Sequence, residues 1–446
     1  KTLHPRIHAG ILARREDPQH METMQKHDLG TIDLVCVNLY PFAAAIRSDP
    51  QNLANAIENI DIGGPTLLRA AAKNYTGVVV ICNPDRYETI MQGWSSGFSP
   101  ESRLELAREV FNHTAAYDAM IAGYLNARAR DPFPENLTLS YQRVQTLRYG
   151  ENPHQRAAYY RTENDFPLRQ LQGKELSFNN MLDFSAALRT ALSLPGHGVA
   201  IIKHLNPCGA ASDSSLEQAF RTARTCDPVS AFGGVIGISG EVDGPLARAI
   251  TENFVEGVIA RDFTPEALQV FSGKPQVRLL GYSDEEARSL LSGGGMEMRR
   301  IWNGYLFQEL DHPLKSEWKV VSDRQPDEAE WEALRFAWAL VRNVKSNAIV
   351  FCGRGRSLGI GAGQMSRLDS TVVAVRKAEE AGLALSGSAV ASDAFFPFRD
   401  GVDQLARAGA TAVIAPGGSV RDGEVIAAAN EHGLAMVFTG VRHFLH

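Results

Sequence analysis

Short apolar runs alternate with segments of helical periodicity along the whole chain. Runs rich in β-branched side chains at 33–39 and 77–81 predict buried strands. Apolar residues at three- and four-residue spacing predict a helix containing 67–73 and one or two amphipathic helices between 101 and 126. The same patterns predict later strands at 199–203, 234–238, 348–351, 412–415 and 435–438, and later helices at 328–341 and 372–381. This alternation predicts an α/β protein with largely parallel sheets covered by helices on both faces.

Two prolines interrupt the helical pattern after residue 126. They lie in the segment 130–136, Arg-Asp-Pro-Phe-Pro-Glu-Asn, and predict a domain boundary between about residues 128 and 142. A chain of 446 residues has room for about three domains at roughly 150 residues each. The run Gly293-Gly294-Gly295 is typical of a loop tip, and a linker is its simplest interpretation.

Composition and charge argue against a nucleic-acid or membrane partner. The chain carries 45 basic and 51 acidic side chains without a long run of like charge, so a nucleic-acid partner is not expected. Its longest apolar stretches have strand length and fall short of the roughly 20 residues that span a bilayer, so no membrane partner is expected. Five scattered cysteines lack the paired spacing of a disulfide framework or a zinc site and predict a reducing, cytoplasmic location. The sequence opens without Met and without a secretion leader, from which we expect an N-terminal segment to be missing and any site built partly from it to be incomplete.

The segment 203–209, Lys-His-Leu-Asn-Pro-Cys-Gly, follows a predicted strand. The carboxyl ends of strands are where α/β sheets present reactive groups. A lysine beside His204 favours a neutral imidazole, which could accept a proton from an amine. The competing interpretation is a solvated strand end. Pro207-Cys208 also matches half of a zinc deaminase signature, but position 211, where that signature has its second cysteine, is Ala211, so zinc is not expected.

Other segments combine ligand-binding side chains with turn residues. The segment 148–155, Arg-Tyr-Gly-Glu-Asn-Pro-His-Gln, offers a guanidinium suited to phosphate, or is a polar surface turn. The glycines of 226–234 could let backbone approach a ligand, although a β-turn is the better explanation of them. Asn347 could orient an amide-bearing ligand or cap a turn. The phenylalanine-rich segment 392–400 suits stacking on a flat heterocycle, or forms a satellite hydrophobic cluster.

Near the start, the segment 61–66, Asp-Ile-Gly-Gly-Pro-Thr, leads into the helix that contains Lys73. Backbone amides at this helix N-terminus could face an anion, and helix capping is the competing interpretation. Neither a Gly-x-Gly-x-x-Gly motif nor a Walker sequence is present.

Taken together, these segments resemble the bifunctional purine-biosynthesis family that joins an AICAR transformylase to an IMP cyclohydrolase. The resemblance covers essentially the whole chain. Eight ordered motifs carry it: Lys-Thr-Leu-His-Pro (1–5), Asn-Leu-Tyr-Pro-Phe (38–42), Asp-Ile-Gly-Gly (61–64), Arg-Ala-Ala-Ala-Lys-Asn (69–74), the segments 148–155, 203–209 and 392–400, and Arg-His-Phe-Leu-His (442–446).

The resemblance implies a methylglyoxal-synthase-like doubly wound first domain, truncated at its start, and two cytidine-deaminase-like α/β subdomains without zinc. The implied cyclohydrolase domain spans 1–130, a linker spans 131–141, and the transformylase spans 142–446 with a break near 310–325. The implied reactions are formyl transfer from 10-formyltetrahydrofolate to AICAR, giving FAICAR, and dehydrative closure of FAICAR to IMP. Family members are homodimers that share the transformylase site across their interface, and a monovalent cation is possible.

The resemblance also assigns site residues. His204 would be the base of formyl transfer, Lys203 would stabilise the developing oxyanion, and Lys73 would be the acid/base residue of the cyclohydrolase. The AICAR ribotide would contact Arg148, Tyr149, Gly233, Glu256, Asn347, Arg367 and Arg442. The folate would contact Leu368, Phe395, Asp400, Ser419 and Val420. The cyclohydrolase nucleotide would contact Lys1, Thr2, Val37, Asn38, Tyr40, Asp61 and Ile62.

Two departures and two rivals accompany this assignment. Glu256 replaces the family's Asp and the hydrophobe at Leu368 varies, but both keep the chemical character. One rival function is a first domain that binds nucleotide without turnover. The other is a zinc deaminase, which bound zinc would support.

Overall fold

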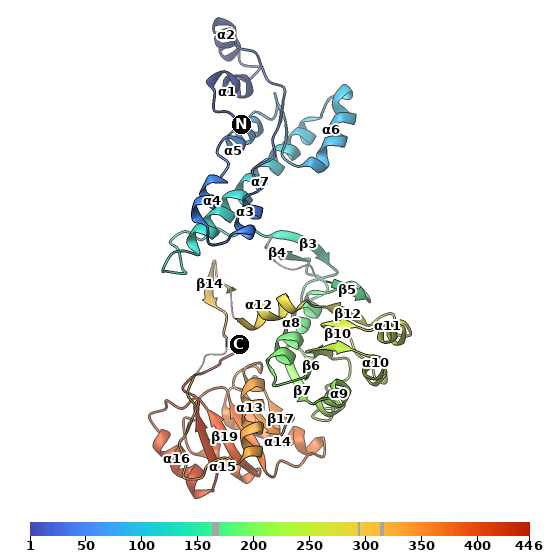
Figure 1. The fold of residues 1–446 in the computed structure, drawn as a ribbon, viewed down its shortest axis with the longest axis vertical. Coiled ribbons are helices and arrows are strands. Elements are labelled where there is room, and N and C mark those ends of the chain that lie inside the picture. Colours follow the sequence, from blue (N-terminus) through green and yellow to red (C-terminus); the bar gives the residue numbers. More distant parts are fainter. Residues whose placement is uncertain (163–168, 293–294, 313–315) are drawn as a thin grey trace. The chain divides into compact units, whose positions relative to one another are not determined.

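The computed structural model describes residues 1–162, 169–292, 295–312 and 316–446. The chain forms two compact units, one made of Lys1–Arg143 with Tyr160–Asn164 and the other of Val144–Tyr159 with Asp165–His446. Figure 1 traces both along the sequence. Across the described ranges, no helix is long and apolar enough to cross a membrane. Gly293 and Gly294 of the predicted loop tip lie outside the described residues.

The first unit is built on two parallel strands, β1 (Leu34–Cys36) and β2 (Val79–Ile81). Helices α5 (Gly63–Lys73) and α7 (Pro100–Asn126) pack on this pair, and α1 (Pro5–Leu12) packs on α5. The remaining helices are α2 (Pro18–Lys26), α3 (Phe42–Ser48), α4 (Leu53–Glu58) and α6 (Tyr87–Gly93), with 3-10 turns at Pro84–Arg86 and Trp94–Ser96. Segment 101–126 is one helix rather than two, because Ser99 caps its start and nothing breaks it before Asn126.

The second unit is organised by one mixed sheet of twelve strands, in the order β15-β20-β19-β18-β16-β17-β7-β6-β8-β10-β12-β5. Its strands are β5 (Arg169–Gln172), β6 (Gly198–Lys203), β7 (Asn206–Ser212), β8 (Val235–Ile238), β10 (Gly257–Ala260), β12 (Arg278–Gly281), β15 (Lys319–Val320), β16 (Ile349–Gly353), β17 (Arg356–Gly361), β18 (Ser388–Ser392), β19 (Ala410–Ala415) and β20 (Ala435–Phe438). Separate two-stranded sheets are β3 (Gln142–Leu147) with β4 (Ala157–Arg161), β9 (Glu241–Val242) with β11 (Asp262–Phe263), and β13 (Met296–Ile301) with β14 (Gly304–Glu309).

The same arrangement occurs twice in this sheet. We call the described residues of 144–312 the first half and those of 316–446 the second half. In the first half the strand order is β7-β6-β8-β10-β12, and in the second it is β17-β16-β18-β19-β20. Corresponding pairs have the same direction, with an antiparallel hairpin, an antiparallel third strand and two parallel strands beyond it. Each half therefore repeats one α/β subdomain.

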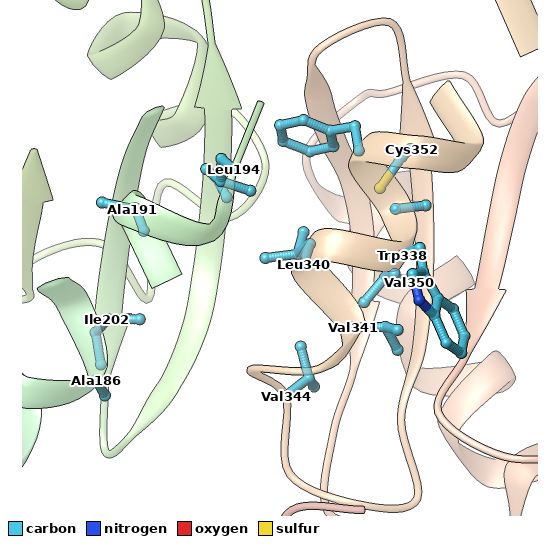
Figure 2. Packing of buried hydrophobic residues seen from close by; sticks show 14 of the residues in the cluster. Ala186, Ala191, Leu194, Ile202, Trp338, Leu340, Val341, Val344, Val350 and Cys352 are labelled. Atoms are coloured by element: carbon cyan, nitrogen blue, oxygen red, sulfur yellow. The ribbon is translucent and has the colours of Figure 1, made fainter. Parts of the chain in front are cut away.

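Corresponding helices cover the strands of each half. The first half has α8 (Phe178–Ser193), α9 (Leu216–Arg224), α10 (Gly244–Thr251), α11 (Pro265–Ser272) and α12 (Asp284–Ser292), and the second has α13 (Glu328–Val341), α14 (Arg367–Glu380), α15 (Asp400–Arg407) and α16 (Asp422–Glu431). Side chains of α8 and α13 enter one hydrophobic cluster common to both halves. Figure 2 shows Ala191 and Leu194 of the first half together with Leu340 and Val341 of the second. Helix α12 packs against this shared cluster, whereas α9, α10 and α11 of the first half and α14, α15 and α16 of the second contribute to a separate cluster in each half.

The halves join where β7 meets β17. Arg356 lies opposite Ala211 in an antiparallel register. The buried hydroxyl of Ser357 accepts a hydrogen bond from Ala210 N at 2.9 Å and donates one to Ala210 O at 3.1 Å. A side chain thus continues the backbone ladder across the junction.

The expectation of largely parallel sheets is wrong for the large sheet. Seven of its eleven strand pairings are antiparallel and four are parallel. The cause is two hairpins whose second strands lack a strand-like sequence, because β7 contains Pro207 and Gly209, and β17 contains Gly359 and Gly361.

Close packing of a helix on each hairpin requires glycine at two of these positions. A Cβ on Gly209 would lie 1.9 Å from Ala223 O of α9, and one on Gly361 would lie 1.8 Å from Ser370 O of α14. The backbones of helix and strand approach so closely that a larger residue has no room.

Candidate functional site

The predicted transformylase residues gather at one end of the twelve-stranded sheet. Strand β6 finishes there at Lys203, and its antiparallel neighbours β7 and β8 begin there. Because β7 and β17 are antiparallel, β17 also finishes at this end, and so do β18, β19 and β20. We call it the His204 end of the sheet.

The Lys203-His204 pair sits on a tight hairpin turn. Lys203 pairs with Asn206, and the two residues between them, His204 and Leu205, have φ values of 51° and 67°. Positive φ at both central positions is the geometry of a type I′ turn, which matches the twist of the strands it joins. The turn leaves the His204 side chain exposed and is fastened by Leu205 N, which donates to Asp183 Oδ1 at 2.9 Å.

Asp183 is a site residue that the sequence analysis did not find. It lies on α8, lines a cavity of about 250 Å³ with His204, and holds the turn. Burial raises the pKa of Asp183, and the Leu205 amide, His204 and Lys203 counter that rise only in part. A single acid within the helix 178–193 gave no periodic signal by which to find it.

The Lys203 ammonium group is held by a loop. Nζ donates to Phe232 O at 3.0 Å and to Gly233 O at 2.9 Å. Gly233 has a φ of 66°, and a Cβ there would lie 3.1 Å from Nζ. Glycine therefore permits this approach, and the segment 226–234 does bring backbone to a charged group.

A second cavity, of about 280 Å³, also borders His204. Its wall includes Lys203, His204, Cys208, Asp227 and Lys377. Burial raises the pKa of the Cys208 thiol to about 12, and its Sγ donates to Ile201 O at 3.3 Å. The thiol is thus a packed, protonated group at neutral pH. Within the described residues, no three His, Cys, Asp or Glu side chains converge as metal ligands.

Three further predicted AICAR contacts lie in the first half. Glu256 precedes β10 and forms an ion pair with buried Arg278, Oε2 to Nη1 at 2.8 Å. Arg148 and Tyr149 follow β3, where the Arg148 guanidinium lies over the Tyr149 ring and donates to its hydroxyl at 2.7 Å. These two contacts join Arg148 and Tyr149 to each other and not to Lys203 or His204.

The other predicted AICAR contacts form a cluster in the second half. Arg367, at the start of α14, donates to Asp393 Oδ1 at 3.3 Å, and Asp393 is fully buried. Burial lowers the pKa of Arg367 despite this acid, and nearby Arg442 lowers it further. Arg367 and Arg442 both lie over the Phe444 ring, 5.9 and 4.3 Å from its centre. Two cations thus lie against the same aromatic ring, and we call Arg367, Asp393, Arg442 and Phe444 the Arg367 cluster.

The C-terminal segment 442–446 crosses the His204 end of the sheet. His443 N donates to Asp393 O at 3.1 Å, beyond β18, and Ser346 N donates to Leu445 O at 2.8 Å, just before β16. Asn347, the next residue, donates from Nδ2 to Gln364 O at 2.9 Å. The segment therefore brings Leu445 beside Ser346, the neighbour of Asn347, and places Arg442 next to the residue that bonds Asp393.

The predicted folate contacts follow the carboxyl ends of two parallel strands. Phe395 and Asp400 come after β18, and Ser419 and Val420 come after β19, while Leu368 is the second residue of α14. Phe395 is 37% exposed and Val420 fully exposed, so both offer apolar surface to a ligand. Asp422 bonds the Ser419 amide at 3.1 Å and fixes that loop.

The two halves present their site residues some distance apart. Four strand spacings separate β6 from β18 and six separate it from β20. At roughly 4.8 Å a spacing these are about 19 and 29 Å. Within one chain, the Lys203-His204 turn and the Arg367 cluster are therefore distinct groups.

In the first unit, three predicted nucleotide contacts come together. Lys1 Nζ forms an ion pair with buried Asp61 and lies 4.1 Å from the centre of the Tyr40 ring. Asp61 also accepts bonds from Tyr40 N at 3.1 Å and Gly64 N at 2.7 Å, while Tyr117 OH accepts from Asp61 N. This group follows the carboxyl end of β1, the position expected for an α/β site.

Its other predicted members are spread around it. Val37 N bonds Ile81 O at 3.0 Å, Asn38 Oδ1 accepts from Tyr87 OH at 3.1 Å, and Thr2 adjoins Lys1. Ile62 is 64% exposed. Lys73 is the last residue of helix α5, which starts at Gly63, two residues after Asp61. The ten residues from Gly63 to Lys73, at about 1.5 Å each, place Lys73 roughly 15 Å from the start of the helix. The described structure does not bring Lys73 to the Lys1–Tyr40–Asp61 group.

Comparisons with known proteins find family models and relatives that match the sequence. The sequence matches the family model described as AICARFT/IMPCHase bienzyme over residues 71–377 and the MGS-like domain over residues 3–66. Two curated relatives, each a bifunctional purine biosynthesis protein PurH, come from the Ames and Paris strains of Leptospira biflexa serovar Patoc. Each is 49% identical over 455 residues, which cover 100% of this chain and 87% of the relative. A solved structure, the crystal structure of ForH, is 36% identical over 28% of this chain and 66% of that chain, with a TM-score of 0.26.

Proposed function

The chain belongs to the AICARFT/IMPCHase bienzyme family, and from that premise we propose which of its residues carry out the two reactions. It is an AICAR formyltransferase and an IMP cyclohydrolase of purine biosynthesis, acting on AICAR, FAICAR and a folate co-substrate. Nucleotide binding without turnover is not favoured.

For formyl transfer we place the chemistry at the Lys203-His204 turn. The 5-amino group of AICAR is a weak nucleophile, because its lone pair is delocalised into the ring, so it must be oriented and lose a proton as it attacks the formyl carbon. His204 would accept that proton as the new C–N bond forms. N10 of tetrahydrofolate would then leave with the electron pair of the broken C–N bond and take up a proton.

The observation that carries this proposal is the pair of bonds that holds Lys203. Its ammonium group donates two hydrogen bonds to the carbonyls of Phe232 and Gly233 and has a third proton free for a ligand. A fixed cation beside His204 could stabilise the oxyanion that develops on the formyl oxygen.

The Arg367 cluster suits the ribotide. Arg367 and Arg442 would bind the phosphate, with Phe444 below them and Asn347 nearby to meet the carboxamide. Arg148, Tyr149, Gly233 and Glu256 would contact the same substrate from the first half. The folate, 10-formyltetrahydrofolate, would lie along Leu368, Phe395, Asp400, Ser419 and Val420.

These two groups support a homodimer. Since about 19 Å or more separates them across the sheet of one chain, a single AICAR molecule would be better served by the turn of one copy and the cluster of another. We therefore propose a transformylase site shared between two chains.

We also propose a bound monovalent cation and a cytoplasmic location. Asp393 Oδ2 is buried without a hydrogen-bond partner among the described residues, and such an oxygen suits a cation. Zinc is not proposed. We place the enzyme in the cytoplasm, where its substrates and reduced thiols belong.

For ring closure we place the nucleotide beside Lys1, Tyr40 and Asp61, with Thr2, Val37, Asn38 and Ile62 around it. Lys73 stays the predicted acid/base residue, although it lies at the other end of α5. The domain limits stay as proposed, with the cyclohydrolase at 1–130, a linker at 131–141 and the transformylase at 142–446, divided near 310–325.

The direct test supplies AICAR and 10-formyltetrahydrofolate and follows tetrahydrofolate formation, while a separate reaction supplies FAICAR and follows IMP. We expect both products. Failure to form tetrahydrofolate at a normal IMP rate would refute the proposed transformylase site alone.

A further inference from the structure

The loop that holds Lys203 is itself held from inside by an acid. Asp227 begins the loop, and its carboxylate accepts Ser230 N at 3.0 Å and Ser230 Oγ at 2.6 Å. Asp227 O also accepts Ala231 N at 3.0 Å. These bonds close a compact turn directly before Phe232 and Gly233, whose carbonyls receive the Lys203 ammonium.

The same carboxylate is bound by the other half of the unit. Lys377 Nζ of α14 lies 3.0 Å from Asp227 Oδ2, and the two side chains are only 29% and 13% exposed. Burial raises the pKa of Asp227, but the bonds from Ser230 and Lys377 lower it more, so the carboxyl is ionised at neutral pH. The contact is thus a partly buried ion pair, which water screens less than a surface pair.

Lys377 connects the two groups of proposed site residues. It lies on α14, the helix that begins with Arg367 and Leu368. Through Asp227, this helix of the second half contacts the loop that fixes Lys203 in the first half. The described chain offers a continuous physical path, in which Lys377 holds Asp227, Asp227 holds the loop, and the loop carbonyls hold Lys203.

We propose that Asp227 and Lys377 are positioning residues for formyl transfer, which set the place of the Lys203 ammonium by fixing the loop 227–233 against α14. This inference rests on the proposed role of Lys203. It assigns to α14 a second task besides carrying Arg367 and Leu368.

A competing role follows from the cavity of about 280 Å³, because Asp227 and Lys377 line it together with Lys203 and His204. They could contact substrate directly. The two roles differ in kinetics, since a lost substrate contact raises KM, whereas a displaced Lys203 lowers kcat with substrate affinity kept.

The test measures kcat and KM for AICAR and for 10-formyltetrahydrofolate in the full chain carrying Lys377→Met. We expect kcat to fall about 10- to 100-fold, as misplacement of a reacting group by an ångström does, with both KM values within about twofold. Lys377→Arg, which keeps the charge, should recover most of the rate.

Matched controls use neighbours and the other activity. Arg376 is exposed and pairs with Glu380 on the same helix, so Arg376→Met should leave formyl transfer unchanged. IMP formation from FAICAR is placed in the first unit and should be unchanged in every variant, while the retained KM values for the transformylase substrates report that the second unit has folded. If Lys377→Met fails to fold because Asp227 is left without its partner, the double variant Asp227→Asn, Lys377→Met removes the unpaired charge. The loss of kcat in the double variant should equal the loss in Asp227→Asn alone.

Two results would overturn the inference. An unchanged kcat in Lys377→Met and in the double variant would show that the ion pair does not act on Lys203, and a raised KM with normal kcat would assign it to substrate binding. Lys203→Met separates the premise from the inference: if that variant turns over normally, the proposed role of Lys203 fails, whereas if it is inactive while Lys377→Met is normal, only the positioning role fails.

Discussion

The two halves of the twelve-stranded sheet have the same topology but opposite orientations. At either end of the sheet they therefore expose different ends of the repeated subdomain. The junction pairs β7 with β17 antiparallel, so the halves run in opposite senses. At the His204 end, the first half contributes its hairpin turn and the second contributes the carboxyl ends of β18, β19 and β20. At the opposite end, the second half has its own hairpin turn, at Arg354 and Gly355, between β16 and β17.

The carboxyl ends of the first half are arranged differently. After β8 and β10 the chain forms β9 and β11, which pair in parallel at Glu241 and Asp262. This small ladder covers the end at which an α/β subdomain would usually bind its ligand. In the second half, the segments after β18 and β19 carry Phe395, Asp400 and Ser419 instead. One fold therefore supplies two kinds of site, a reactive turn and an open strand end, according to which end is left available.

The largest effect that would test this comparison concerns the two hairpin turns. His204→Ala should lower formyl transfer about 10²- to 10⁴-fold, the typical worth of a general base, and leave IMP formation unchanged. The measurement is kcat for tetrahydrofolate release.

Its control is the corresponding turn of the second half. Arg354 pairs there with Glu332 at 2.6 Å on an exposed surface, so Arg354→Ala should change neither reaction. Equal losses in both variants would contradict the division of labour between the halves.

A smaller effect tests whether the halves are built alike. Gly209→Ala and Gly361→Ala each place a methyl group under 2 Å from a helix carbonyl, of α9 and α14 respectively. Each should lower the free energy of unfolding by about 1–3 kcal/mol or more, because strand and helix must separate. Urea unfolding of the whole chain, followed by fluorescence, measures it. A loss confined to one variant would show that the repeated packing is not equivalent.

The smallest effect concerns acid. Helices α15 and α16 are linked by Arg399, which bonds Asp403 and Glu431, and by His432, which lies 2.8 Å from Asp403. The bonds from Arg399 and His432 lower the pKa of Asp403 to about 2 from an ordinary 3.8. A lowered pKa contributes stability that is complete above pH 3.8 and is lost as pH falls toward 2. Since Arg399 and Glu431 are exposed to solvent, which screens their charges, the contribution is small.

Asp403→Asn provides the measurement. Its urea midpoint should lie slightly below that of the unmodified chain at pH 7, and the difference should vanish near pH 2. A difference that stayed constant across this range would show that the carboxylate charge is not what links α15 to α16.

The sequence predicted most elements of both halves but not their directions. Helix 328–341 and the strand at 199–203 are confirmed within one residue, and the strand at 412–415 within two, because their apolar patterns are long and clear. Strands β7 and β17 were missed, since close helices demand glycine where strand propensity demands β-branched residues. Without them, the reversal between the halves could not be seen.

The candidate site shows the same limit. The resemblance placed Lys203, His204 and Arg367 among the functional residues, and Asp227 lay without a role in the segment 226–234, but Asp183 and Lys377 belong to no recognised motif. They contact the site only through tertiary packing: Asp183 from α8 and Lys377 from α14. Residues that support others in this way carry no signal of their own in a single sequence.

The Ser357 bridge at the junction has a consequence for folding order. The pairings among the five repeated strands of each half join segments that lie near one another in the chain, whereas Ser357 contacts Ala210 across 147 residues. Closing so long a loop costs conformational entropy before any contact rewards it. We therefore expect each half to nucleate on its own hairpin and the junction to form late, so that the continuous sheet is the last feature of the second unit to assemble.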